Sequence, residues 1–274
     1  MQLIERLDWQ GRSVAWARRG DGPPVVMCHG TPWSSRLWSL YADALSHDFT
    51  VYLWDMPGYG QSSKHPDHAV DLGIQAELFA DLLRHWGLTQ PHVVAHDYGG
   101  AVSLRAHLLH GAPYASLALV DVVALRPWGS EFFRLVADSS EVFASLPGVV
   151  HRGALEAYIG TASHPGLSVE QMATLTAPWL SPDGQSAFYR QIAEADERFT
   201  DEVQDRYGEI ALPVKVIWGR EDSWIPEDRA TRLAGMIPGA ELDLIEGAGH
   251  LIQYDAPVRL TASLQRWLRS RRQR

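Results

Sequence analysis

The chain has 274 residues, 46% of them hydrophobic, and a formal net charge of −9. This length is enough for one large domain with an insertion, and the negative charge argues against nucleic acid as a partner. No run of about 18 apolar residues occurs, so we expect no membrane-spanning helix and no membrane partner.

The N-terminal residues Met1–Arg6 lack the apolar stretch of a signal peptide. The single cysteine, Cys28, excludes an internal disulfide, and its apolar surroundings in sequence predict a buried, inert thiol. From these features we expect a cytoplasmic protein. The sequence leaves the oligomeric state open and is compatible with a homodimer.

Apolar, β-branched runs alternate along the chain with segments of helical period, which predicts an α/β fold. The expected strands are Val14–Ala17, Val25–Cys28, Thr50–Trp54, His92–Ala95, Leu117–Val123, Val214–Trp218 and Leu242–Ile245. The expected helices are Leu37–Ser46, Leu72–Trp86, Ala101–His110, Glu227–Met236 and Val258–Leu268. Several of these strands are apolar on both faces, as a mostly parallel sheet flanked by helices requires.

The alternation stops between positions 126 and 207, where aromatic residues lie on short, helix-like pieces broken by proline and glycine. We therefore expect an α/β core formed by residues 1–125 and 208–274, with residues 126–207 inserted as a helical cap over the ends of the strands. Packing of the cap onto the core is sufficient to explain most of these aromatics.

A turn with a carboxylate at its tip follows the strand that begins at His92. Positions 93–100 read Val-Val-Ala-His-Asp-Tyr-Gly-Gly, so Asp97 stands where a strand–turn–helix nucleophile elbow carries its nucleophile. Ala95, Gly99 and Gly100 supply the small side chains that so sharp a turn needs. A carboxylate in this position attacks carbon and forms an alkyl ester. The alternative is that Asp97 only caps the following helix.

Three further groups follow strands in the same way. The backbone N–H of Thr31, just after His-Gly at positions 29–30, and that of Tyr98 predict an oxyanion hole. Asp222 follows the strand that ends at Trp218, and His250 lies on a Gly-Ala-Gly-His loop. The order nucleophile, acid, histidine is that of the hydrolase triad on an α/β sheet.

With these motifs the chain resembles the α/β-hydrolase superfamily from position 29 to position 250, including an Asp-x-Pro-Gly-x-Gly-x-Ser loop at positions 55–62. Its elbow is similar to those of epoxide hydrolases, haloalkane dehalogenases and fluoroacetate dehalogenases. The resemblance implies the α/β-hydrolase fold with an inserted cap, and no cofactor. It further implies that Asp97 attacks the substrate, that His250 activates the water that cleaves the ester, and that Asp222 orients His250. Asp121, where some dehalogenases place the acid, is the alternative to Asp222.

The resemblance also bears on the substrate. Tyr98 stands where haloalkane dehalogenases usually have a halide-binding tryptophan and fluoroacetate dehalogenases an arginine. Tyr189 lies in a segment resembling the one that carries a proton-donating tyrosine of epoxide hydrolases, and Tyr158 is expected to supply a second donor. Epoxide hydrolysis is therefore favoured over haloalkane or haloacid dehalogenation. A non-hydrolytic ligand-binding protein and an esterase or lactonase remain further alternatives.

We expect the substrate to be a small, mostly apolar molecule. Four residues beside the expected catalytic groups or in the cap are expected to line its pocket: His29, Gly30, Trp33 and Trp179. No metal site is expected, because His65 and His68 have no further ligands at suitable spacing.

Overall fold

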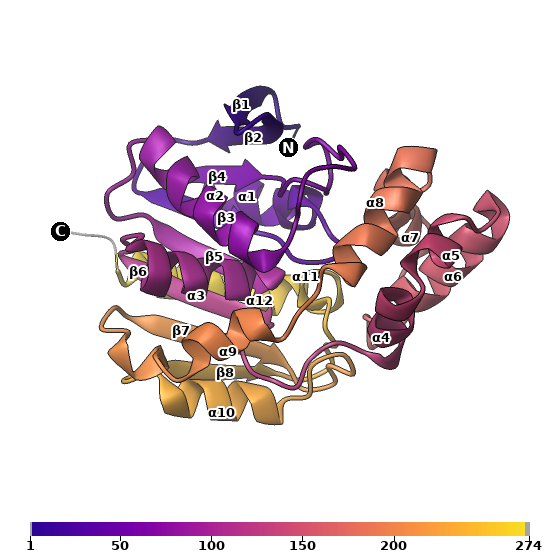
Figure 1. Cartoon of the computed structure of the whole chain (residues 1–274). Coiled ribbons are helices and arrows are strands. Elements are labelled where there is room, and N and C mark those ends of the chain that lie inside the picture. The colour runs from indigo at the N-terminus through magenta and orange to yellow at the C-terminus, as the bar shows by residue number, and fades with distance from the viewer. Residues whose placement is uncertain (1, 272–274) are drawn as a thin grey trace.

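The computed structural model describes residues 2–271, which contain one eight-stranded sheet in the order β1-β2-β4-β3-β5-β6-β7-β8 (Figure 1). The strands are β1 (Glu5–Trp9), β2 (Arg12–Arg19), β3 (Pro24–Cys28), β4 (Thr50–Trp54), β5 (His92–Asp97), β6 (Ser116–Val122), β7 (Val214–Gly219) and β8 (Glu241–Ile245). β1 pairs antiparallel with β2, and β2 with β4. All other neighbours are parallel. The predicted mostly parallel sheet is confirmed.

Both faces of the sheet are buried. Successive side chains of a strand point to opposite sides, so each strand contributes residues to both faces. In β5, Val93 and Ala95 pack into one hydrophobic cluster and Val94 into the other. This explains why the central strands are apolar at nearly every position. Cys28, at the end of β3, is buried, and burial raises the pKa of its thiol to about 12.

Helices cover each face of the sheet. Buried residues on one face come from α2 (Leu72–His85), α3 (Tyr98–His110), α9 (Arg198–Gln204) and α10 (Asp228–Met236). Those on the other face come mainly from α1 (Ser39–Leu45), α11 (Ile252–Asp255) and α12 (Pro257–Arg269). Short 3₁₀ turns precede α1 and β7, namely η1 (Ser35–Trp38) and η3 (Tyr207–Glu209). The N-terminus of α2 is capped by Asp71, which accepts hydrogen bonds from the Gly73 and Ile74 N–H groups.

A group of helices lies between β6 and β7 in the chain and to one side of the sheet (Figure 1). Its members are α4 (Glu131–Asp138), α5 (Ser140–Ala144), α6 (Gly148–Gly160), α7 (Val169–Thr176), η2 (Ala177–Trp179) and α8 (Pro182–Ala193). We refer to α4–α8 as the cap helices. α9 falls inside the predicted insertion but packs against α3. The division at positions 126 and 207 stays a prediction.

The prediction and the structure differ at some elements and at several boundaries. β1 and α11 were not predicted. β5 runs to Asp97 and α3 begins at Tyr98, so the expected gap before the helix at Ala101 is absent. The strand therefore passes into the helix without an intervening loop, which fixes the direction of the side chain at the junction.

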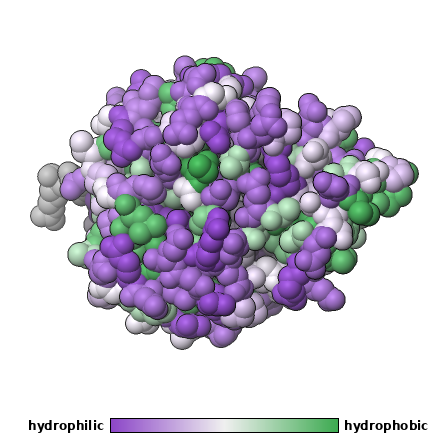
Figure 2. Space-filling view, viewed as in Figure 1, coloured by the Kyte–Doolittle hydropathy of each residue, from purple (hydrophilic) through white to green (hydrophobic). Residues whose placement is uncertain are grey.

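The described helices include none that is both long and apolar enough to cross a membrane. Figure 2 shows hydrophilic side chains over much of the visible face and apolar ones at the outer end of the cap helices. Val142, Val149 and Val150 are exposed there.

Candidate active site

The junction between β5 and α3 holds Asp97 in a conformation that few non-glycine residues adopt. Its φ is 51° and its ψ is −121°, and such backbone strain is typical of functional sites. The pairing of β5 with β6 shifts register between His96 and Asp97. A Cβ atom at Gly99 would lie 2.7 Å from the His29 carbonyl oxygen, and one at Gly100 would lie 2.3 Å from Val122 Cβ. The two glycines are therefore needed for the turn to close.

The Asp97 carboxylate turns away from the helix it precedes. Although Asp97 stands at the N-cap position of α3, its side chain makes no capping hydrogen bond. Instead, Oδ1 accepts a hydrogen bond of 2.6 Å from the Thr31 N–H. Gly30 is packed against the same oxygen, since a Cβ there would lie 2.2 Å from Oδ1. Tyr98, the other expected donor, is the first residue of α3, where an N–H has no acceptor within the helix.

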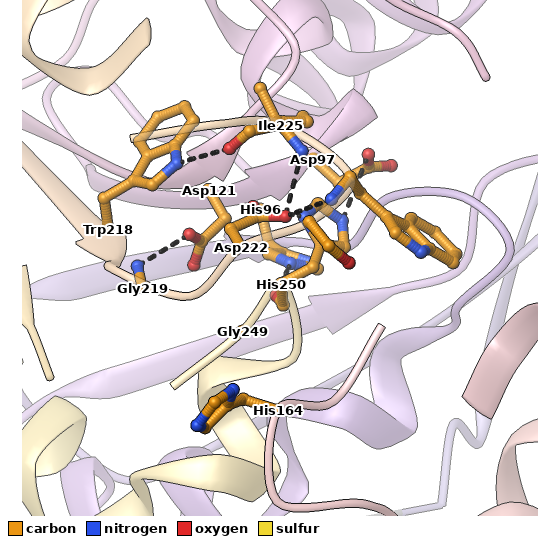
Figure 3. Close-up of polar contacts among 12 residues, drawn as sticks. His96, Asp97, Asp121, His164, Trp218, Gly219, Asp222, Ile225, Gly249 and His250 are labelled. Atoms are coloured by element: carbon orange, nitrogen blue, oxygen red, sulfur yellow. Dashed lines mark hydrogen bonds and ion pairs between the residues drawn. The ribbon is translucent and has the colours of Figure 1, made fainter. Parts of the chain in front are cut away.

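His250 lies between two carboxylates, as Figure 3 shows. Its Nδ1 is 2.9 Å from Asp222 Oδ2, and its Nε2 is 3.4 Å from Asp97 Oδ2. All three side chains are buried. Burial by itself lowers the pKa of His250, but Asp222 and Asp97 together outweigh this effect and hold that pKa well above its ordinary value.

The loops that carry this histidine and its acid are held by their own hydrogen bonds. Asp222 Oδ1 accepts from the Trp224 and Ile225 N–H groups at 2.7 and 2.9 Å. His96 Nε2 donates to the His250 carbonyl oxygen at 3.0 Å. Burial lowers the pKa of His96 well below its ordinary value, so this ring is neutral. Asp222 and His250 are therefore each held by hydrogen bonds other than the one that joins them.

Asp121 ends up beside this group without contacting the histidine through a hydrogen bond. It is fully buried near the end of β6, and its Oδ1 accepts from the Gly219 N–H at 2.8 Å. In the structure Asp222, and not Asp121, is hydrogen-bonded to His250.

A cavity of about 410 Å³ opens above Asp97. Its wall includes six aromatic side chains, namely Tyr98, Trp128, Phe132, Phe133, Tyr158 and Trp224, together with the polar residues Thr31 and Glu131. Tyr158 stacks on Trp224, with 4.6 Å between ring centroids, and Trp224 stacks on His250 at 5.0 Å.

The expected role of Tyr189 is corrected by its position. Tyr189 is buried inside the cap, its hydroxyl is 2.9 Å from His151 Nδ1, and it is absent from the cavity wall. The structure thus brings Tyr158, but not Tyr189, to Asp97. The two tyrosines lie on different helices, α6 and α8. A resemblance of the segment around Tyr189 could not show which of the two reaches the cavity.

The four expected pocket residues also lie behind the wall rather than in it. His29 Nε2 accepts from the Met56 N–H, and Gly30 packs under Asp97. Trp179 donates its indole N–H to the Pro32 carbonyl oxygen at 2.8 Å, while Trp33 stacks on Trp224. Trp128 and Trp224 line the cavity where Trp33 and Trp179 were expected. The only signals for these two residues in the sequence were their positions, one at the start of the insertion and the other beside Asp222.

Comparison with known proteins places these features in a family. The model of the alpha/beta hydrolase fold family matches residues 23–257. A structure of an alpha/beta hydrolase fold protein from Burkholderia ambifaria is 43% identical, with a TM-score of 0.94, and the match covers 96% of this chain and 97% of that one. The dihydrolipoyllysine-residue acetyltransferase component of an acetoin cleaving system from Pseudomonas putida is 27% identical over 94% of this chain and 67% of its own length. A fluoroacetate dehalogenase from Burkholderia sp. is 29% identical over 60% of this chain and 59% of its own.

Proposed function

We propose that this chain, which belongs to the alpha/beta hydrolase fold family, hydrolyses a small, mostly apolar epoxide to a diol through an ester of Asp97. It is a hydrolase of that fold, and the predicted fold is confirmed by the family match. The choice of nucleophile, of reaction and of substrate class is the proposal. It is supported by the arrangement of carboxylates and by the hydrogen-bond donors in the cavity wall.

In the first step one oxygen of Asp97 attacks an epoxide carbon. The Thr31 N–H is bound to Oδ1, so Oδ2 is the oxygen without a backbone donor and the better nucleophile. As the new C–O bond forms, the ring C–O bond breaks and the ring oxygen takes a proton from a donor in the wall. The products of this step are an alkyl ester of Asp97, a hydroxyl group on the neighbouring carbon and the phenolate of the donor, which regains its proton when His250 releases one after esterification.

The hydrogen bonds that these donors already make favour an epoxide over a haloalkane as the substrate. The Trp128 and Trp224 indole N–H groups are each engaged by a threonine hydroxyl at 2.9 Å. By contrast, the Tyr98 hydroxyl is buried without a hydrogen-bond partner, and Tyr158 also faces the cavity. A departing halide is served by N–H donors, whereas an opening epoxide oxygen needs a proton. The cavity wall offers phenols, which can give the opening epoxide oxygen its proton.

Both phenols remain protonated at neutral pH. Burial raises the pKa of Tyr98 and of Tyr158 well above the ordinary value, and the nearby Asp97 charge adds to the effect at each. None of the described residues that line the cavity is lysine, arginine or histidine, and Glu131 adds a negative charge there. A substrate carboxylate would meet repulsion, which disfavours a haloacid.

In the second step water cleaves the ester. Esterification neutralises Asp97, which is one of the two carboxylates that raise the pKa of His250. The pKa of His250 then falls, and the imidazole becomes available as a base at the step that needs one. Asp222 keeps Nδ1 protonated and Nε2 directed at the water. Attack on the ester carbonyl carbon returns the Asp97 carboxylate and releases the diol.

The test compares an epoxide with a bromoalkane of the same carbon skeleton, both small enough for a cavity of about 410 Å³. We expect diol formation and little bromide release. A single turnover in ¹⁸O-labelled water should place the label in Asp97, because the water oxygen enters the carboxylate and the diol receives the old one. Bromide release without diol formation would replace the proposal with a dehalogenase, and label in the first diol alone would exclude the ester.

A further inference from the structure

The buried carboxyl group of Asp121 has no role in the steps above, and its bonding is incomplete. Oδ1 accepts from the Gly219 N–H at 2.8 Å, whereas Oδ2 accepts no hydrogen bond from any described group. The side chain is fully buried, and its backbone φ is 42°. A buried carboxylate oxygen without a partner is costly, and a non-glycine residue with positive φ adds strain. Both features indicate that Asp121 has a role besides filling space in the core.

The neighbour of Asp121 is the triad acid. Figure 3 shows the Asp121 and Asp222 side chains side by side, and burial, reinforced by the Asp222 charge, raises the pKa of the Asp121 carboxyl group. Asp222 already accepts hydrogen bonds from three donors, namely two backbone N–H groups and His250. Two buried carboxylates so close together cannot both be ionised without a large penalty. The proton therefore belongs to Asp121, the carboxyl group with a single donor.

We propose that Asp121 is a positioning residue that acts as a neutral carboxylic acid and donates a hydrogen bond from Oδ2 to Asp222. This inference rests on the proposed roles of Asp97, His250 and Asp222. The bond gives the orphan oxygen a partner and fixes the Asp222 carboxylate from the side opposite to His250.

The hydrogen bond from Asp121 to Asp222 matters for His250. Four titratable groups of the described residues lie around the imidazole: Asp222, Asp97, the neutral ring of His96, and Asp121 on the far side of Asp222. Burial raises the pKa of Asp121 well above its ordinary value, and the Asp222 charge reinforces this effect. With Asp121 neutral, the imidazolium is stabilised by two carboxylates rather than three. The hydrogen bond to Asp222 limits that stabilisation further, so that His250 can lose its proton once Asp97 is esterified.

Two variants of Asp121 separate a neutral donor from a charge. Asp121→Asn keeps an oxygen for the Gly219 N–H and an N–H donor for Asp222, so ester hydrolysis should stay within about threefold of the wild type. The acid limb of the pH profile of ester hydrolysis, followed as kcat, should not move. Asp121→Ala removes the donor, so ester hydrolysis should fall by about tenfold or more and the acid limb should move to higher pH.

The pKa of His250 should be followed in parallel by NMR in all three proteins, because this measurement does not depend on turnover. If Asp121 is ionised, Asp121→Asn removes a negative charge and lowers the pKa of His250; that outcome would overturn the proposal. So would an unchanged profile and an unchanged His250 pKa in Asp121→Ala. A failure of the proposed function has a different signature, since Asp97→Ala would then retain turnover whatever Asp121 does.

Discussion

Tyr158 is one of the two phenols proposed as proton donors, and Tyr158→Phe tests it by removing one hydroxyl while keeping the ring. The ring packs on Trp224 at 4.6 Å and on Phe132 at 4.9 Å between centroids, and both contacts survive the change. KM should therefore change little. Loss of a positioned acid costs about 10²–10⁴-fold in rate, or roughly 2.7–5.4 kcal/mol of transition-state stabilisation. We expect the lower end, because Tyr98 remains as a second phenol.

The matched control is Tyr189→Phe in the same cap. Its hydroxyl contacts His151 Nδ1 inside the cap and does not reach the cavity. This variant should lose about 0.5–1.5 kcal/mol of stability from one hydrogen bond and keep its epoxide kcat. The assay is diol formation under saturating epoxide, with thermal unfolding measured on both variants.

Three results would contradict the reasoning. Unchanged epoxide turnover in Tyr158→Phe would show that its phenol does not protonate the ring oxygen. A large loss of kcat in Tyr189→Phe, without a loss of stability, would show that the cap rearranges when substrate binds. A fall in bromide release equal to the fall in diol formation would show that the phenol does not distinguish the two leaving atoms.

Four further changes probe the site. His250→Gln should alkylate without hydrolysing, so the peptide that contains Asp97 should gain the mass of the substrate; unimpaired steady-state turnover would contradict the role of the histidine. Asp97→Asn removes one of the two carboxylates that raise the pKa of His250, so an NMR titration should find that pKa lower than in the wild type. Because the folded-state pKa of His250 is raised, its ion pairs stabilise the wild type below the ordinary histidine pKa, and this stability is lost as pH rises through the folded-state value. The stability difference from Asp222→Asn should shrink over that interval, and a difference that grows instead would reverse the sign. Gly100→Ala would put a Cβ 2.3 Å from Val122 Cβ and should cost about 1–3 kcal/mol, which an unaltered Tm would refute.

The strands of the sheet could be predicted because the apolar pattern that identifies each strand lies within that strand. β4 was predicted to the residue, and β3, β5 and β8 to within two residues at each end, since strands buried on both faces are apolar throughout. β1 was missed for the opposite reason. It is an edge strand with charged residues at Glu5, Arg6 and Asp8, and it pairs only with β2. A sequence window cannot distinguish such a segment from a surface loop.

The grouping of Asp97, Asp222 and His250 could be predicted for a related reason. Each follows the end of a parallel strand, and these ends meet at one edge of the sheet. The walls of the cavity could not be predicted in this way. Trp33, Trp179 and Trp224 are equally apolar, and which of them faces the substrate depends on how the cap is seated.

The structure shows what seats the cap, and this explains why Tyr158 rather than Tyr189 reaches Asp97. The segment after α6 is tied to both catalytic loops: Thr161 accepts from the Trp224 indole through its hydroxyl, and the Ala162 carbonyl accepts from the Leu251 N–H at 3.0 Å. These bonds join the end of α6 to the residues that follow the triad acid and the histidine. α6 is thus held by the loops that carry the triad acid and the histidine, and Tyr158 lies in its last turn. α8, which carries Tyr189, is held elsewhere, because its Gln191 accepts a hydrogen bond of 2.5 Å from the Thr31 hydroxyl. A proton donor on α6 therefore keeps its position relative to the acid and the histidine.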